Sequence, residues 1–314
     1  MLSVKSRKSG RNGGAEKHGD SVMSNSDDEF TAGTEPDSDV ETLPVVPAAL
    51  SQDERYFTLL ITAIRKCANY KPKFGQGRGE GLSLSQFSAL YSADPFYHWL
   101  GIDSPLMYAA HKAAGGMTSI YRQVGIGSQW IFQQMLQDCL GLSLEQSVWS
   151  YAVKAAKGRQ RRLTLDGRIT IAEIENEIAR QRVTDWLTAA ALTIGLPKST
   201  LANIKGVVFE VRQGYKSKDS KRQNADIANA SKAYAHLHIP VLLLFSTQID
   251  GDVAQRYQEN LWLLLNGLTE GENTASAYGF CRDIIGYDLA DFFQRFSPRI
   301  RAEVEIVLKA LLAA

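Results

Sequence analysis

Two short, almost continuously apolar runs mark the second half of the chain. They are "GVVFEVRQ" at 206–213 and "IPVLLLFST" at 239–247. Runs of this length and character are typical of strands that are buried on both faces. Between them, residues 221–237 carry apolar side chains at helical spacing, including Ile227, Ala230 and Tyr234. The pattern predicts a strand–helix–strand unit.

The rest of the apolar pattern is mainly helical. Ser51 can cap a helix in which Phe57, Leu60 and Ile64 fall on one face. Further helices are expected within 83–153, 170–197, 254–265 and 288–313, and the stretch 170–197 fits either one long helix or two shorter ones. The expected fold class is therefore α/β, with a mixed sheet flanked by helices and a helical N-terminal region before it.

Three regions follow from this pattern. Residues 1–43 are rich in Ser, Gly and charged side chains, with Phe30 as their one aromatic residue, so we expect a disordered tail. Residues 44–153 form the helical region. Residues 154–314 form the α/β core with its C-terminal helices.

Charge and cysteine content restrict the class of protein only mildly. The whole chain has a formal net charge of +1, while an acidic segment in the tail leaves the remainder mildly basic. The three cysteines are far apart, which favours reduced thiols in a cytoplasm over a disulfide framework or a metal site. No apolar run is long enough for a membrane span, so we expect no membrane partner.

The first buried strand ends in a concentration of positive charge. Glu210 shares one face of the strand with Arg212. Four more basic residues follow around the start of the next helix: Lys216, Lys218, Lys221 and Arg222. Helix N-termini favour anions, and lysine and arginine strengthen that preference. A carboxylate beside several cations suits phosphodiester hydrolysis, where the carboxylate holds a divalent metal and the cations hold the polyanion.

A second basic segment, "KAAKGRQRRLTLDGR", occupies residues 154–168. It has two interpretations, either a solvated helix end or a patch that contacts phosphates.

The stretch "GVVFEVRQGYKSKDSKRQNADIANASKAY" followed by "IPVLLLFST" resembles the PD-(D/E)xK nuclease superfamily, and within it type II restriction endonucleases. The resemblance covers about residues 160–250, and "MTSIYRQVGIG" is similar to the ApaLI-like group. The resemblance implies a restriction-endonuclease-like core, Mg²⁺ as cofactor, double-stranded DNA as substrate and a homodimer. Glu210 then matches the metal-binding acidic residue of the strand.

The sequence departs from the superfamily pattern at the lysine, where it has Arg212. Arginine stays protonated and cannot act as a base, so either Arg212 only holds charge or Lys216 or Lys218 takes that role. The superfamily also requires an aspartate on an earlier strand. The sequence leaves Asp185, Asp166 and Asp226 as candidates for it, with Glu175 and Glu177 as possible contributors.

"TAAALTIGLPKSTLANI", at 188–204, has the spacing of a helix-turn-helix. It resembles the DNA-binding motif of phage-repressor-type regulators, and its second helix would present Lys198, Ser199 and Asn203 to DNA. Two helices of an ordinary core give the same pattern. The alternatives to a nuclease are therefore a non-enzymatic DNA-binding regulator and an interaction protein without a nucleic-acid partner.

Overall fold

The computed structural model describes residues 41–74, 81–154, 160–215 and 220–313. Residues 43–314 form one unit by their contacts, and residues 1–42 are assigned to another. The predicted disordered tail lies almost wholly outside the described residues. The boundary expected between 153 and 154 is not a domain boundary, because it falls inside a β-hairpin and the helices before it pack on the sheet after it.

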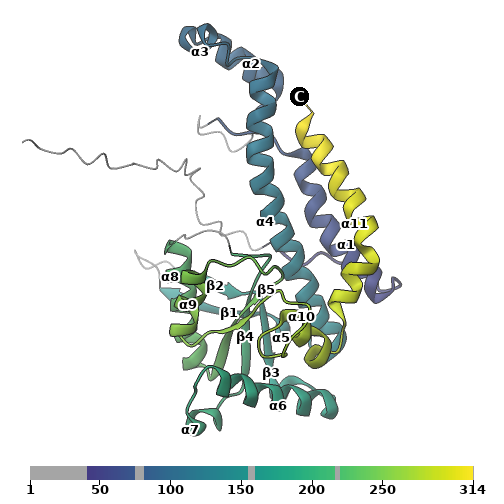
Figure 1. Ribbon diagram of the computed structural model, residues 1–314, viewed down its shortest axis with the longest axis vertical. Helices are drawn as coiled ribbons and strands as arrows, with labels where there is room; N and C mark the ends of the chain where they lie inside the picture. Colours follow the sequence, from purple (N-terminus) through teal and green to yellow (C-terminus); the bar gives the residue numbers. More distant parts are fainter. Residues whose placement is uncertain (1–40, 75–80, 155–159, 216–219, 314) are drawn as a thin grey trace, which may run out of the picture. The chain divides into compact units, whose positions relative to one another are not determined.

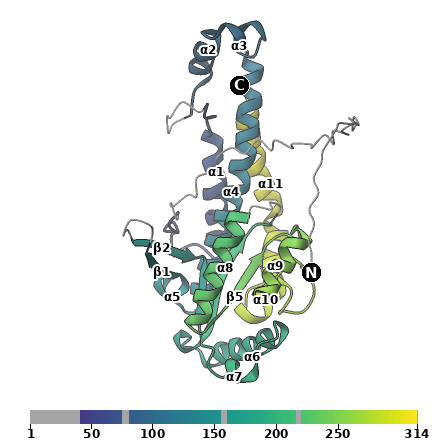
Figure 2. The ribbon, with the colours of Figure 1, turned by 90° about the vertical axis from the view of Figure 1, so that its left-hand side faces the viewer.

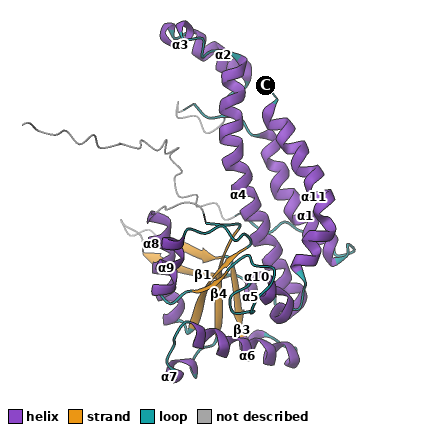
Figure 3. Cartoon of the chain, viewed as in Figure 1, coloured by secondary structure: helices purple, strands orange, loops and turns teal. Residues whose placement is uncertain are grey.

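A four-stranded mixed sheet lies among helices in the unit formed by residues 43–314 (Figure 3). Its strands, in spatial order, are β3 (Gly167–Thr170), β4 (Gly206–Arg212), β5 (His238–Leu244) and β6 (Leu263–Leu265). β3 is antiparallel to β4, and β4, β5 and β6 are parallel to one another. The predicted α/β class with a mixed sheet is confirmed.

Strands β4 and β5 are buried along their whole length, as their apolar sequences predict. Gly206 is the first residue of β4, at the point where β3 approaches it closely. A Cβ atom placed on Gly206 would lie 2.0 Å from the carbonyl oxygen of Ile169. A residue without a side chain is therefore required at this position for β3 to pair with β4.

Eleven α-helices are described in these residues. They are α1 (Gln52–Arg65), α2 (Leu84–Ser92), α3 (Pro95–Trp99), α4 (Pro105–Leu140), α5 (Leu144–Ser147), α6 (Glu177–Thr193), α7 (Lys198–Leu201), α8 (Ser220–Ala235), α9 (Gly251–Glu259), α10 (Ala277–Phe280) and α11 (Leu289–Leu312). Short 3₁₀ segments occupy Lys66–Asn69 and Ile171–Glu173, and a π-helical turn occupies Cys281–Ile285. Among the described residues, no helix combines the length and the apolar character that crossing a bilayer requires.

The two faces of the sheet have different covers. Val207, Phe209 and Val211 of β4 face the large core built from α1, α4, α6, α10 and α11. Leu242 and Leu244 of β5 face a smaller core with α8 and α9, which lie together on the other face (Figure 2). Since side chains alternate along a strand, Glu210 and Arg212 point toward α8 and α9.

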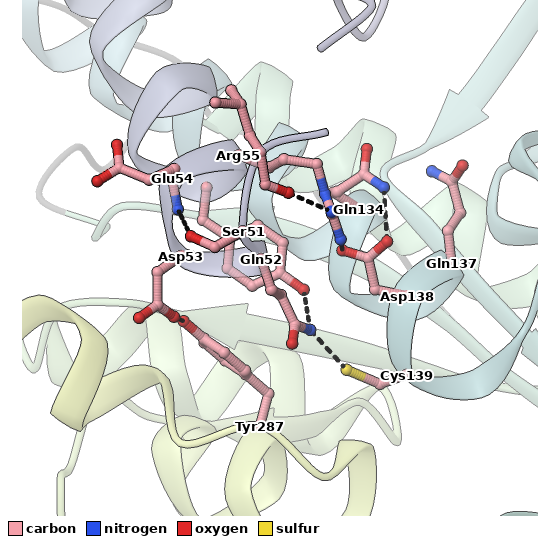
Figure 4. A network of polar contacts seen from close by, with 12 residues as sticks. Ser51, Gln52, Asp53, Glu54, Arg55, Gln134, Gln137, Asp138, Cys139 and Tyr287 are labelled. Atoms are coloured by element: carbon pink, nitrogen blue, oxygen red, sulfur yellow. Dashed lines mark hydrogen bonds and ion pairs between the residues drawn. The ribbon is translucent and has the colours of Figure 1, made fainter. Parts of the chain in front are cut away.

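Helix α1 forms as predicted, with Ser51 as its cap and its apolar face buried. It packs against α4 and α11 (Figure 1). Polar contacts join the same helices at one end of α1 (Figure 4). Arg55 pairs with Asp138 of α4 at 2.8 Å, and Asp53 pairs with Arg295 of α11 at 2.6 Å. Helices α1 and α4 of the N-terminal region thus pack together with the C-terminal helix α11 in one layer.

Two elements differ from the expectation. The segment 154–168 is not a helix end, because β1 (Trp149–Lys154) and β2 (Gln160–Leu165) form an antiparallel hairpin that is followed by β3. The helix expected over 254–265 ends at Glu259, and residues 263–265 form β6. Leu261 has a φ of 58°, a left-handed conformation that a helix cannot continue through.

Candidate active site

A buried cation stands between two buried carboxylates at the carboxyl end of β4. Nη2 of Arg212 lies 2.9 Å from Oε1 of Glu210 on the same strand and 2.6 Å from Oδ2 of Asp226 on α8. All three residues are less than one-tenth exposed. Burial alone would lower the pKa of Arg212, but the adjacent charges of Glu210 and Asp226 outweigh it and raise that pKa. Arg212 is therefore permanently charged and cannot serve as a base.

Two tyrosines complete this cluster. The hydroxyl of Tyr257, on α9, donates to Oδ2 of Asp226 and lies 3.4 Å from the hydroxyl of Tyr215. The guanidinium of Arg212 lies 4.9 Å from the centre of the Tyr215 ring, a cation–π contact. Burial, followed by the charge of Asp226, raises the pKa of Tyr257, so Tyr257 is a neutral donor. The cluster fixes α8 and α9 to the carboxyl end of β4.

Asp166 reaches the same end of β4 from the neighbouring strand. It precedes β3, whose first residue Gly167 pairs with Phe209, so antiparallel pairing places Asp166 beside Glu210. Its Oδ2 accepts a hydrogen bond of 2.8 Å from the backbone N–H of Val211. Of the aspartates that the sequence leaves open, Asp166 is the one that approaches Glu210 from an earlier strand.

Helix α4 supports this arrangement with two side chains that the sequence analysis missed. Nε2 of Gln133 donates to the backbone carbonyl of Asp166 at 2.8 Å, and Nε2 of Gln129 donates to the carbonyl of Val211 at 3.3 Å. The sequence does show two polar residues, Gln129 and Gln133, on the apolar face of a long helix. Their partners belong to strands that are distant along the chain, so periodicity alone does not assign them.

The structure separates Asp185 from this group. Asp185 lies on α6, accepts a hydrogen bond of 2.8 Å from Gln181 and lines an open groove with Trp186. Helix α6 lies at the end of the sheet where β4 begins, opposite the end that carries Glu210 (Figures 1 and 2). The expected metal set of Glu210, Asp185 and Asp226 is therefore not brought together. Glu177 also lines the α6 groove.

The expected helix-turn-helix is incomplete. Its second helix, α7, is a single turn of four residues that ends at Leu201. Asn203 lies beyond it and donates to the carbonyl of Ser199 at 3.2 Å. The chain cannot extend α7 because Lys205 already pairs with the carbonyl of Leu237 at the entry to β4. Lys198, Ser199 and Asn203 therefore do not form the face of a recognition helix.

Two of the four basic residues expected after β4 lie outside the described residues, and the other two lie on α8. Lys216 and Lys218 lie outside the described residues. Lys221 and Arg222 lie in the first turn of α8, directly after that segment. Arg256 of α9 reaches the same turn, where it donates to Gln223 at 2.8 Å and to Asn224 at 2.6 Å.

Asp166 and Glu210 are two carboxylates at this end of the sheet that could bind a hard metal ion. Within the described ranges, no three side chains of His, Cys, Asp or Glu are arranged to hold a metal ion. Mg²⁺ commonly takes one or two carboxylates and keeps several waters, so a site with two carboxylates has enough protein ligands for it in number. Glu210 would have to bind the metal while its Oε1 stays 2.9 Å from Nη2 of Arg212.

The network around α1 offers no comparable chemistry. It contains a thiol, Cys139, which accepts a hydrogen bond of 3.3 Å from Gln52 (Figure 4). Burial raises the pKa of Cys139, so this thiol is not activated as a nucleophile. We therefore interpret the network as structural.

Comparison of the chain with protein-family models, with curated proteins and with solved structures finds no match. The assignment of a function therefore depends on the site itself.

Proposed function

We propose that this protein is a Mg²⁺-dependent endonuclease that hydrolyses phosphodiester bonds in double-stranded DNA. The observation that carries the proposal is the position of Asp166, whose carboxylate is 2.8 Å from the N–H of Val211 and therefore beside Glu210. Asp166, directly before β3, and Glu210, on the antiparallel strand β4, thus lie at the same end of the sheet, where a strand–helix–strand unit leaves its central strand. This is the arrangement that the resemblance to PD-(D/E)xK nucleases implies.

In this proposal Asp166 and Glu210 hold the metal, which supplies an activated water and stabilises charge on the scissile phosphate when it is bound. Arg212 orients Glu210 through their 2.9 Å contact. Because Arg212 keeps its proton, the role of the superfamily lysine passes to Lys216. Lys218, Lys221 and Arg222 hold the DNA backbone, since lysine and arginine at a helix N-terminus bind phosphate.

The biological role that fits this activity is that of a type II restriction endonuclease in a restriction–modification system. We propose that it acts in the cytoplasm, where the three free cysteines Cys67, Cys139 and Cys281 stay reduced. A homodimer would bring one site to each strand of a palindromic sequence.

The test is incubation of plasmid DNA with the full chain and Mg²⁺, with and without a chelator. The proposal expects discrete fragments that the chelator abolishes, and it expects Glu210→Gln to cut far more slowly. A gel shift without cutting would instead favour a DNA-binding regulator. No shift and no cutting would favour an interaction protein.

A further inference from the structure

The amino-terminal half of α4, together with α3, exposes an unusual amount of apolar surface. Phe96, Tyr97, Trp99 and Tyr121 are exposed to 61, 38, 79 and 44%. At about 150–250 Å² for each aromatic side chain, these four leave roughly 400 Å² of aromatic surface exposed. The large exposed aliphatic residues of the same region are Leu100, Leu106 and Met117.

This surface lies beside a packed aromatic cluster. Phe87 of α2 is fully buried and contacts the rings of Tyr91, on the same helix, and Tyr108 of α4. Asp94 caps α3 through the N–H groups of Phe96 and Tyr97. Helix α3 has no buried residue of its own, and its Tyr97 ring stacks on Tyr91 of α2 with 4.9 Å between the ring centres.

The charged groups near this surface are turned to partners within the chain. Asp103 accepts from Ser92 at 2.8 Å and lies 2.7 Å from Nδ1 of His98. Lys112 donates to the carbonyl of Ala313 at 2.8 Å. A polyanion or an anionic membrane needs cations to bind it, and this surface offers few. The surface therefore suits another apolar protein surface.

The exposed side of α4 carries a single stripe of large and small apolar residues. Leu106, Ala110, Ala114, Met117 and Tyr121 follow one another at spacings of three and four, so they form one stripe along the helix. In an antiparallel pair of α4 helices with a two-fold axis between 113 and 114, Leu106 faces Tyr121 and Ala110 faces Met117. Each pairing is repeated by the symmetry, and the alanines leave room for close approach.

We propose that two copies of this chain associate through this stripe, with the α3 aromatic residues extending the contact. The roughly 400 Å² of exposed aromatic surface, before the aliphatic residues are added, is about half of the ~800 Å² that each partner buries in a standard interface. It lies within the range of about 300–600 Å² for the largest patch on a typical monomer, a patch that is often functional. The other face of α4 is already covered, because Leu311 of α11 packs against Gly116. This inference stands whether or not the protein cleaves DNA, since its test is the oligomeric state.

The test measures molar mass in solution across a range of concentrations for Ala110→Lys, for Met117→Glu and for their mixture. The wild type is expected to be a dimer. Each variant alone should raise the dimer dissociation constant by about tenfold or more, because it places a charge against an apolar residue. The mixture should form heterodimers, because residue 110 of one copy then faces residue 117 of the other with opposite charge.

Ile178→Lys is the matched control, because Ile178 is 77% exposed on α6, outside the stripe, and its replacement should leave the dimer intact. Circular dichroism and thermal melting verify that each variant folds, and Trp99→Asp serves as a further variant if one of them does not. A monomeric wild type overturns the proposal. If that monomer binds neutral phosphatidylcholine vesicles, the apolar surface is a lipid-binding surface instead. Folded monomeric variants whose mixture does not dimerise also overturn it.

Discussion

Arg212 is the residue on which the stability of the candidate site depends most. It is the buried cation between Glu210 and Asp226, so replacing it with Met leaves two adjacent buried carboxylates without compensation. We expect Arg212→Met to lower the free energy of unfolding by about 3–5 kcal/mol. Arg212→Lys keeps the charge and should recover part of the loss. Urea unfolding at neutral pH measures both variants, and a Met variant as stable as the wild type would show that the cluster does not hold the fold.

His238 makes the stability of the folded protein depend on pH. Burial lowers the pKa of His238 below its ordinary value of 6.5, a direction that nearby Arg168, His236 and Lys205 reinforce and that the carbonyl of His236 opposes. Because the folded state favours the neutral ring, this contribution to stability is present above the unfolded pKa and is lost as pH falls through the lower folded-state pKa. The wild type should therefore melt at a lower temperature at pH 5 than at pH 8.

The control for this prediction is His236→Asn, which changes an exposed histidine two residues away. His238→Asn should reduce the difference in melting temperature between the two pH values. His236→Asn removes only a lesser cause of the lowered pKa of His238 and should keep most of the difference. Equal pH dependence of the wild type and His238→Asn would contradict the assignment.

At this scale the sequence predicts the placement of a residue only when local alternation decides it. Glu210 and Arg212 were expected on one face of a strand, and they share that face. Asp166 could not be selected in advance, because its approach to Glu210 depends on the pairing of β3 with β4 across about 40 intervening residues. The metal role of Glu210 stays a prediction.

At the scale of elements, the pairing of β3 and β4 depends on Gly206. A methyl group there meets the carbonyl oxygen of Ile169 at 2.0 Å, so Gly206→Ala must displace one strand. We expect a loss of about 1–3 kcal/mol in unfolding free energy, typical of overpacking in a core. Gly251→Ala, at the start of α9, has nothing within 4 Å of the added atom and should be nearly neutral. Denaturant unfolding compares the two, and equal losses would contradict this account of Gly206.

Elements with strong periodicity or continuous apolar runs were predicted well. Helix α1, strands β4 and β5 and helix α11 fall within a few residues of their expected bounds. The single-turn α7 was overestimated because its helical residues are followed at once by the pairing of Lys205 with Leu237. The three-residue β6 was missed because so short an apolar segment also fits the end of a helix.

For the whole molecule, the account predicts that the N-terminal tail is dispensable for folding. From residue 41 onward, where the structure describes the chain, Leu43 and Val46 are the first side chains that pack on the large core. A chain that begins at residue 41 should keep the melting temperature of the full chain and its activity. Insoluble or less stable protein after this truncation would show that the tail contributes to the fold.

The joining of the helical region to the α/β core could not be predicted from local pattern. Arg65 of α1 pairs with Glu303 of α11 at 2.6 Å, although 238 residues separate them. Such contacts appear only when the chain has folded, so the sequence indicated two regions where the structure has one unit of residues 43–314.

The central claim is that Asp166 and Glu210 form the metal site of a nuclease, and the most direct measurement is the rate at which plasmid DNA is cut by Asp166→Asn with Mg²⁺. The asparagine oxygen can still accept from the N–H of Val211, so this variant should fold. We predict a rate at least about a hundredfold below that of the wild type, with Asp185→Asn as the matched control that cuts normally. A folded Asp166→Asn protein that cuts at the wild-type rate, or a wild type that does not cut at all, would contradict the account.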